Sequence, residues 1–199
     1  MSAERFGPFR MTWPPTASLP AQIAHRTMPE TSSALDTIIQ SSTVDLFHSC
    51  GIALAPLPRK REQEVPPRYE LTGTIAFHGR GFTGTLTLSV PKEAFSLVRQ
   101  DPHRPFRDWD WVRELTNQLL GRIKNRLTQF QVGLTAGLPS VMSSDVYDRQ
   151  RNRSEPLAIY RFRTLRGEII VTLNGAIDPA VFVYSGTGNL ATEGDIILF

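Results

Sequence analysis

Apolar residues recur along the chain at two different spacings, and each spacing predicts a different kind of element. Between 33 and 50 the spacing is helical. The apolar positions there share one face, made of Leu35, Ile38, Ile39, Leu46 and Phe47. Between 71 and 90 apolar or small residues alternate with polar ones on both sides of the turn sequence HGRG. That alternation predicts a β-hairpin.

The second half of the chain repeats this order of helix and hairpin. A short helix is expected after Pro91, and a long helix over about 106–130,. The sequence VGLTAGLPSVM, 132–142, is predicted to be extended, and 157–175 predicts a second hairpin that turns at Arg166-Gly167,. Helices beside hairpins favour an α+β fold, with a mainly antiparallel sheet and two long helices packed on it.

Three segments do not fit this pattern. Residues 1–30 contain five prolines and no periodicity, so we expect a disordered or loosely attached tail,. Residues 55–68 form a charged, proline-rich connection within the domain, which we place at 31–199,. Residues 177–199 are expected to be a C-terminal extension, and they end in the apolar sequence GDIILF.

Composition narrows the class of protein. Hydrophobic residues make up 40% and charged residues 21% of the 199 residues, which is typical of a globular domain,. A single cysteine, Cys50, excludes an internal disulfide framework and a multi-cysteine zinc site,. No apolar run approaches the roughly 18 residues that span a bilayer, and prolines interrupt the N-terminus, so a cytoplasmic protein is expected,. The net charge of +3 gives little support to nucleic-acid binding,.

The long helix carries an unusual polar face. At about 100° per residue, the face opposite to Glu114 is apolar. It contains Val112, Leu115, Leu119, Ile123, Leu127 and Phe130. The polar and small residues gather within roughly 60° of Glu114. These residues are Asp110, Glu114, Asn117, Gly121 and Asn125.

Solvation alone does not account for this polar face. Asparagine and glycine are poor helix formers, each costing up to about 1 kcal/mol relative to alanine. Glu114 and Asn117 are spaced i and i+3, which brings their Cβ atoms within about 5–6 Å,. Gly121, one turn beyond Asn117, removes bulk where another molecule could approach. The pattern predicts a carboxylate and a carboxamide held together on a rigid exposed face.

The sequence resembles the CheX-like chemotaxis phosphatases, which are related to the CheC and FliY phosphatases. The stretch DWVRELTN places Asp110, Glu114 and Asn117 in the spacing of that family. The sequence GLPSVMS, 137–143, resembles the family's conserved strand after the helix. Ser143 and Ser144 depart from the pattern, since the family usually has glycine there. The resemblance covers about 33–175.

The resemblance implies a function and roles for the residues. The family hydrolyses the phosphoaspartate of CheY-like response-regulator receiver domains in chemotaxis or two-component signalling. Asn117 would place the attacking water, Glu114 would pair with the receiver's lysine, and Asp110 would support contacts at the periphery. Gly121 would keep the approach clear. The protein would need no cofactor of its own, and Mg²⁺ would be bound by the receiver.

Other interpretations stay open or are excluded by the residues. A non-catalytic CheX-like module that docks a receiver or signalling partner is the alternative. The first helix has no Glu-x-x-Asn sequence, so one active face per chain is expected. Because the family commonly dimerises through sheet edges, GDIILF could cover such an edge or extend into a second copy. The sequence GRGFTG lacks the ending of a phosphate loop, and no G-x-S-x-G motif of a hydrolase is present,. The scattered histidines have no metal-ligand spacing.

Overall fold

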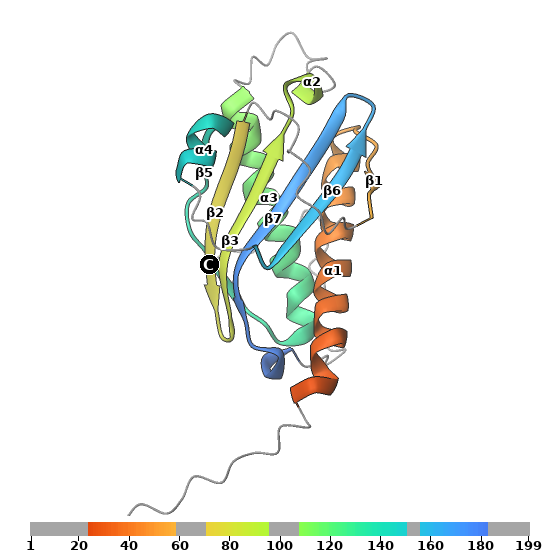
Figure 1. The fold of residues 1–199 in the computed structure, drawn as a ribbon, viewed down its shortest axis with the longest axis vertical. Coiled ribbons are helices and arrows are strands. Elements are labelled where there is room, and N and C mark those ends of the chain that lie inside the picture. Colours follow the sequence, from red (N-terminus) through yellow and green to blue (C-terminus); the bar gives the residue numbers. More distant parts are fainter. Residues whose placement is uncertain (1–23, 59–70, 96–107, 151–155, 183–199) are drawn as a thin grey trace, which may run out of the picture.

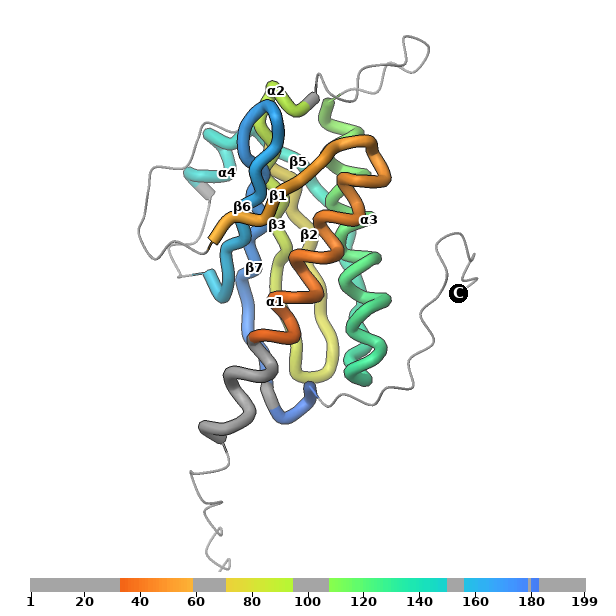
Figure 2. The backbone as a smooth tube through the Cα atoms, turned by 90° about the vertical axis from the view of Figure 1, so that its right-hand side faces the viewer, coloured from red at the N-terminus to blue at the C-terminus, as the bar shows by residue number. Residues whose placement is uncertain are grey.

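A computed structural model describes residues 24–58, 71–95, 108–150 and 156–182. Side chains at 24–32, 150 and 179 are left out of the description. Two long helices, α1 (Ala24–Ser49) and α3 (Asp108–Leu127), cover one face of an antiparallel sheet, as Figures 1 and 2 show. This confirms the predicted α+β class.

The sheet has seven strands in the order β1-β6-β7-β3-β2-β4, with β5 also paired to β2. The strands of the first half are β1 (Ala55–Pro56), β2 (Leu71–Gly79) and β3 (Phe82–Val90). Those of the second half are β4 (Leu134–Ala136), β5 (Ser140–Ser143), β6 (Ala158–Thr164) and β7 (Gly167–Ile177). Short helices complete the described residues: α2 (Lys92–Phe95), α4 (Ser144–Gln150), η1 (Thr128–Phe130) and η2 (Pro179–Val181).

The two halves of the chain exchange strands. Helix α1, strand β1 and the hairpin β2–β3 correspond in order to α3, β5 and the hairpin β6–β7. Strand β1 pairs with β6, in the other half, and β5 likewise pairs with β2. The hairpins meet at the centre of the sheet, where β3 pairs with β7. The twice-repeated order of helix and hairpin is therefore an approximate two-fold arrangement.

The core lies between the sheet and the two long helices. Side chains of one sheet face point into it, and Leu86, Leu88, Val171 and Phe162 are almost fully buried there. On the opposite face, α4 covers the region of β2 and β3, where its Ser144 hydroxyl lies 3.3 Å from that of Thr72. The opposite face is otherwise rich in threonine, because β2 and β3 alternate Thr with core residues.

Several predicted boundaries need correction. Helix α1 begins at Ala24, so residues 24–30 are helical where a tail was expected, and 1–23 lie outside the described residues. Ala55 and Pro56 form strand β1 and so belong to the sheet, although 55–68 was expected to be a connection throughout. The second hairpin turns at Leu165-Arg166, one residue earlier than predicted.

The chain's C-terminal part is only partly described. The stretch after β7 forms the turn of 3-10 helix η2, which does not continue the sheet. The apolar sequence GDIILF lies outside the described residues, so its proposed place at a sheet edge stays a prediction. No helix within the described ranges is long and apolar enough to cross a membrane.

Candidate functional site

Helix α3 is seated on the sheet by a continuous apolar face. Acidic residues in its first turn and basic residues in its last complement the helix dipole,. The buried residues are Val112, Leu115, Thr116, Leu119, Leu120, Ile123 and Leu127. This confirms the predicted core face and adds Thr116 and Leu120 to it. Phe130 lies in η1 and is half-buried against the core.

A glycine in the sheet lets α3 approach closely. A Cβ atom built on Gly73 of β2 would lie 2.0 Å from the Thr116 Oγ1 atom and 3.1 Å from the Val112 Cγ1 atom. The Thr116 hydroxyl donates a hydrogen bond of 2.7 Å to the Val112 carbonyl, so its place is fixed. The absence of a side chain at Gly73 therefore sets the height of α3 above β2.

The predicted polar face points away from the core. Glu114 and Asn117 are exposed, and Asp110, Gly121 and Asn125 are partly exposed. Because all five lie on one straight helix, the fold brings every predicted site residue into one row. A Cβ atom added to Gly121 would meet no other atom within 4 Å. Internal packing therefore gives no reason for a glycine at this position.

Neighbours on the same helix hold the two acidic side chains. The Gln118 amide nitrogen donates to the Glu114 Oε1 atom at 2.8 Å, and the Arg113 guanidinium pairs with the Asp110 carboxylate at 2.9 Å. The sequence reasoning missed Gln118. Its spacing of i+4 from Glu114 was the available signal, since such pairs are neighbours on a helix surface.

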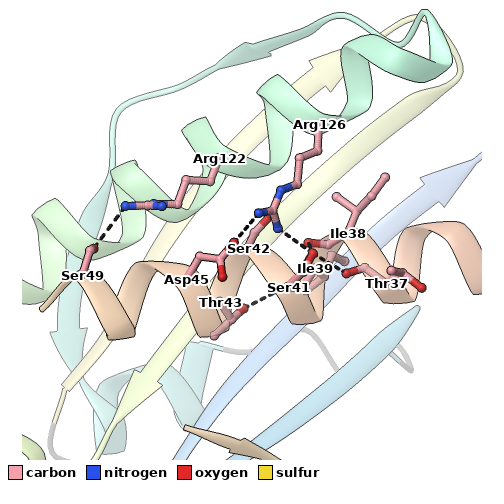
Figure 3. A network of polar contacts seen from close by, with 10 residues as sticks. All are labelled: Thr37, Ile38, Ile39, Ser41, Ser42, Thr43, Asp45, Ser49, Arg122 and Arg126. Carbon is pink, nitrogen blue, oxygen red and sulfur yellow. Dashed lines mark hydrogen bonds and ion pairs between the residues drawn. The ribbon is translucent and has the colours of Figure 1, made fainter. Parts of the chain in front are cut away.

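Two arginines on one flank of α3 join it to α1 (Figure 3). The Arg122 guanidinium donates to the Ser49 hydroxyl at 3.1 Å, and Arg126 forms an ion pair with Asp45. Arg126 also donates to the hydroxyls of Ser41 and Ser42. These contacts fix the rotational position of α3 about its axis, and so help to fix the direction in which Asn117 points.

Helix α1 has a similar burial pattern but different chemistry. Aligning its buried Leu35, Ile38 and Ile39 with the first buried residues of α3 places Thr37 and Gln40 where Glu114 and Asn117 stand. A hydroxyl and a longer amide therefore occupy the places of the carboxylate and the short amide. That each chain has one active face stays a prediction.

The remaining candidate groups lie apart from this face. Cys50 is partly buried at the end of α1 and packs against the core, and burial raises the pKa of its thiol above the usual value. A Ser49 hydrogen bond and the Arg122 charge lower that pKa in part. Among the described residues, no three His, Cys, Asp or Glu side chains are grouped so that they could hold a metal ion.

Comparisons with known proteins bear on the fold. No family model matches the sequence, and no curated protein matches it. Solved structures do match. CheX from Desulfovibrio desulfuricans superposes with a TM-score of 0.55 at 16% identity, over 70% of this chain and 97% of that one. CheX from Vibrio vulnificus gives a TM-score of 0.56 at 15% identity, over the same shares of the two chains.

A third match is a complex. It is the CheX-CheY-BeF3-Mg²⁺ complex from Borrelia burgdorferi, with a TM-score of 0.50 at 13% identity, covering 70% of this chain and 97% of that one. CheC-like proteins of Shewanella match at similar levels. The chain has the α+β fold of the CheX and CheC-like chemotaxis proteins, which agrees with the resemblance found in the sequence.

Proposed function

We propose that this protein is a phosphatase that accelerates hydrolysis of the phosphoaspartate of a CheY-like receiver domain. The observation that carries the proposal is the exposed pair of Glu114 and Asn117 on a rigidly seated helix, in a chain with the CheX fold. The Borrelia complex, in which CheX is bound to CheY, supports a receiver as the partner.

The proposed reaction requires few functional groups from this protein. An acyl phosphate is already activated, so a positioned water is the main requirement. The Asn117 carboxamide can both donate to and accept from that water. Mg²⁺ and a lysine would come from the receiver, so the protein would supply positioning alone. This fits the exposed face, which needs no cleft because the partner itself would close over it.

Glu114 would hold the complex in register. Its carboxylate is exposed and is oriented by Gln118 at 2.8 Å, next to Asn117. A receiver lysine would take the place of solvent beside it, with Asp110 contributing at the periphery. Because both partners of this contact become desolvated, the ion pair would be worth more than an exposed surface pair.

The direct test is a screen of the host's receiver domains. Each receiver is charged with acetyl phosphate, and phosphate release is followed with and without this protein. We expect accelerated release for one receiver or a small group. Binding without acceleration would favour the alternative, a non-catalytic module that docks a receiver or signalling partner.

Reversing the charge of Glu114 should weaken the complex. We expect Glu114→Lys to raise the Kd for a phosphorylated receiver at least ten-fold, because two positive charges would then face each other. Titration of a beryllofluoride-activated receiver measures this. Asp145→Lys is the matched control, since Asp145 is also an exposed acid but lies on α4 at the opposite face of the sheet. Equal effects of the two changes would remove Glu114 from the interface.

Gly121 offers a prediction in which stability and function move in opposite directions. Gly121→Ala should raise the free energy of unfolding by about 0.5–1 kcal/mol, since alanine is the better helix former and nothing lies within 4 Å,. If the glycine clears the receiver's approach, the same change should raise KM several-fold. Thermal unfolding and steady-state hydrolysis measure the two effects. A more stable variant with unchanged KM would show that Gly121 has no part in docking.

A further inference from the structure

Two leucines stand out on the surface for their exposure. Leu138, between β4 and β5, is 93% exposed, and Leu165, in the turn between β6 and β7, is 91% exposed. Single exposed apolar residues are common and carry no argument by themselves. Their positions differ, however: Leu138 lies at the β4–β5 edge of the sheet, on the α3 side, and Leu165 lies at the end of the β6–β7 hairpin.

Leu138 sits on a stiff support. The Gly137 N–H donates to the Ala76 carbonyl at 2.8 Å, which fastens the connection to β2. On the other side, the Ser140 hydroxyl lies 2.8 Å from that of Thr74. Pro139 has a fixed φ and keeps the residue before it extended. The leucine side chain is therefore held in solvent by a backbone that has little freedom left to lose on binding.

The height of Leu138 along the sheet matches the middle of α3. Val112 and Thr116 lie over Gly73, and Ala76 is three residues further along β2. That step of about 10 Å corresponds to six or seven helical residues in the same direction, which is the level of Leu120 and Gly121. Phe77, the next residue after Ala76, accordingly lines one small apolar cavity with Leu120 and Ile123.

Asn117 is also turned towards the flank of α3 on which Leu138 lies. Arg122 and Arg126 lie on the flank of α3 that faces α1, as Figure 3 shows. Helix α1 lies on the β6 side of the sheet, where the Tyr160 hydroxyl donates to its Asp36 carboxylate. Asn117 is turned by roughly 60° to the other flank, toward the edge formed by β4 and β5. Leu138 lies in the connection between β4 and β5, on that edge.

We propose that Leu138 is an apolar docking residue for the receiver domain, at the level of Gly121 and on the flank of α3 towards which Asn117 is turned. This inference rests on the proposed function and extends it with a specificity-determining contact away from the reacting atoms. A receiver that this protein recognises must present an apolar patch beside its phosphorylation site. Charge on the α3 row would set the register, and burial of Leu138 would add affinity that is insensitive to salt.

Leu138→Ser tests the proposal, with Leu165→Ser as the matched control. Both changes remove the same side chain from an almost fully exposed site, so neither should disturb the core. Binding is measured for every host receiver activated with beryllofluoride and Mg²⁺, and KM and kcat for each receiver that is hydrolysed. We expect Leu138→Ser to raise Kd and KM about ten-fold and to leave kcat unchanged, as for partial burial of one leucine. Leu165→Ser should match the unaltered protein.

The outcomes separate this proposal from the proposed function. Hydrolysis with equal KM for the two leucine variants would overturn the role of Leu138 and leave the phosphatase intact. Binding that depends on Leu138 without any hydrolysis would support the docking residue and contradict the phosphatase. A smaller mass of the Leu138→Ser variant in light scattering would assign the leucine to a second copy of this chain and overturn the proposal. Absence of binding by all receivers would contradict both.

Discussion

Asn117→Ala should lower the accelerated rate of phosphate release from the receiver about 100-fold, the usual loss when one preorganised polar group is removed from a reacting centre. The physical reason is the loss of the carboxamide beside Glu114, which would orient the attacking water. Asn117 is exposed and carries no part of the core, so the variant should fold as the unaltered protein does. Circular dichroism and thermal unfolding confirm the fold, and phosphate release gives the rate.

The same helix provides a control for Asn117. Asn125 is also an asparagine of α3, lies about two turns further on and belongs to the same outward polar face,. Asn125→Ala makes the same chemical change and should leave hydrolysis within about two-fold of the original rate, because the residue lies beyond Gly121. A loss shared by both variants would mean that the effect comes from helix stability and would contradict a water-positioning role for Asn117.

Gly73→Ala should destabilise the protein by about 2–3 kcal/mol, as for overpacking at a buried contact. The new methyl group would stand 2.0 Å from the Thr116 Oγ1 atom. Relief requires either a shift of α3 or rotation of Thr116, which breaks its buried hydrogen bond to the Val112 carbonyl. Chemical denaturation measures the loss. Because α3 carries the proposed site, hydrolysis should fall in the same variant even where it remains folded.

A second substitution makes the origin of this loss measurable. Thr116→Ala removes the atom closest to the new methyl group, the Thr116 Oγ1 atom at 2.0 Å. Gly73→Ala should therefore cost much less stability when it is introduced into the Thr116→Ala variant than when it is introduced into the unaltered protein. Strictly additive losses would show that the clash at Thr116 does not limit the approach of α3. Gly121→Ala adds a methyl group at an open position of α3 and is expected to stabilise the protein. Opposite effects of the two glycine substitutions would show that the added methyl group is harmful only where α3 is closely packed.

The exposed face of α3 could be predicted from the sequence because the helical period of its apolar residues determines it. A helix with a single apolar stripe must bury that stripe, so the exposure of Glu114 and Asn117 follows from the buried Leu115 and Leu119. The two hairpins could be predicted equally well, since their alternation and turn residues are local signals. The row of proposed site residues needed no tertiary information, because it lies within one helix.

Other parts depend on contacts that the local pattern does not contain. The short strand at Ala55–Pro56 has no alternation of its own and is defined only by pairing with Phe162 and Arg163. Proline at an edge strand is acceptable because its missing N–H costs no ladder bond there. Helix α4 was missed because its seven residues are too few to show a period. The exposure of Leu138 likewise follows from the sheet edge, since an apolar residue in a predicted strand is normally expected to be buried.

The exchange of strands between the two halves also bears on how the chain reaches its structure. Ala55 pairs with Arg163, which closes a loop of roughly a hundred residues,. Contacts of such high sequence separation slow folding, because the entropy of closing the loop is lost before the pairing can compensate for it. Neither half can complete its share of the sheet alone, so the two should gain their native structure together in one cooperative step. The surface that carries Asn117 then forms only when the β6–β7 hairpin has joined α1 and β1.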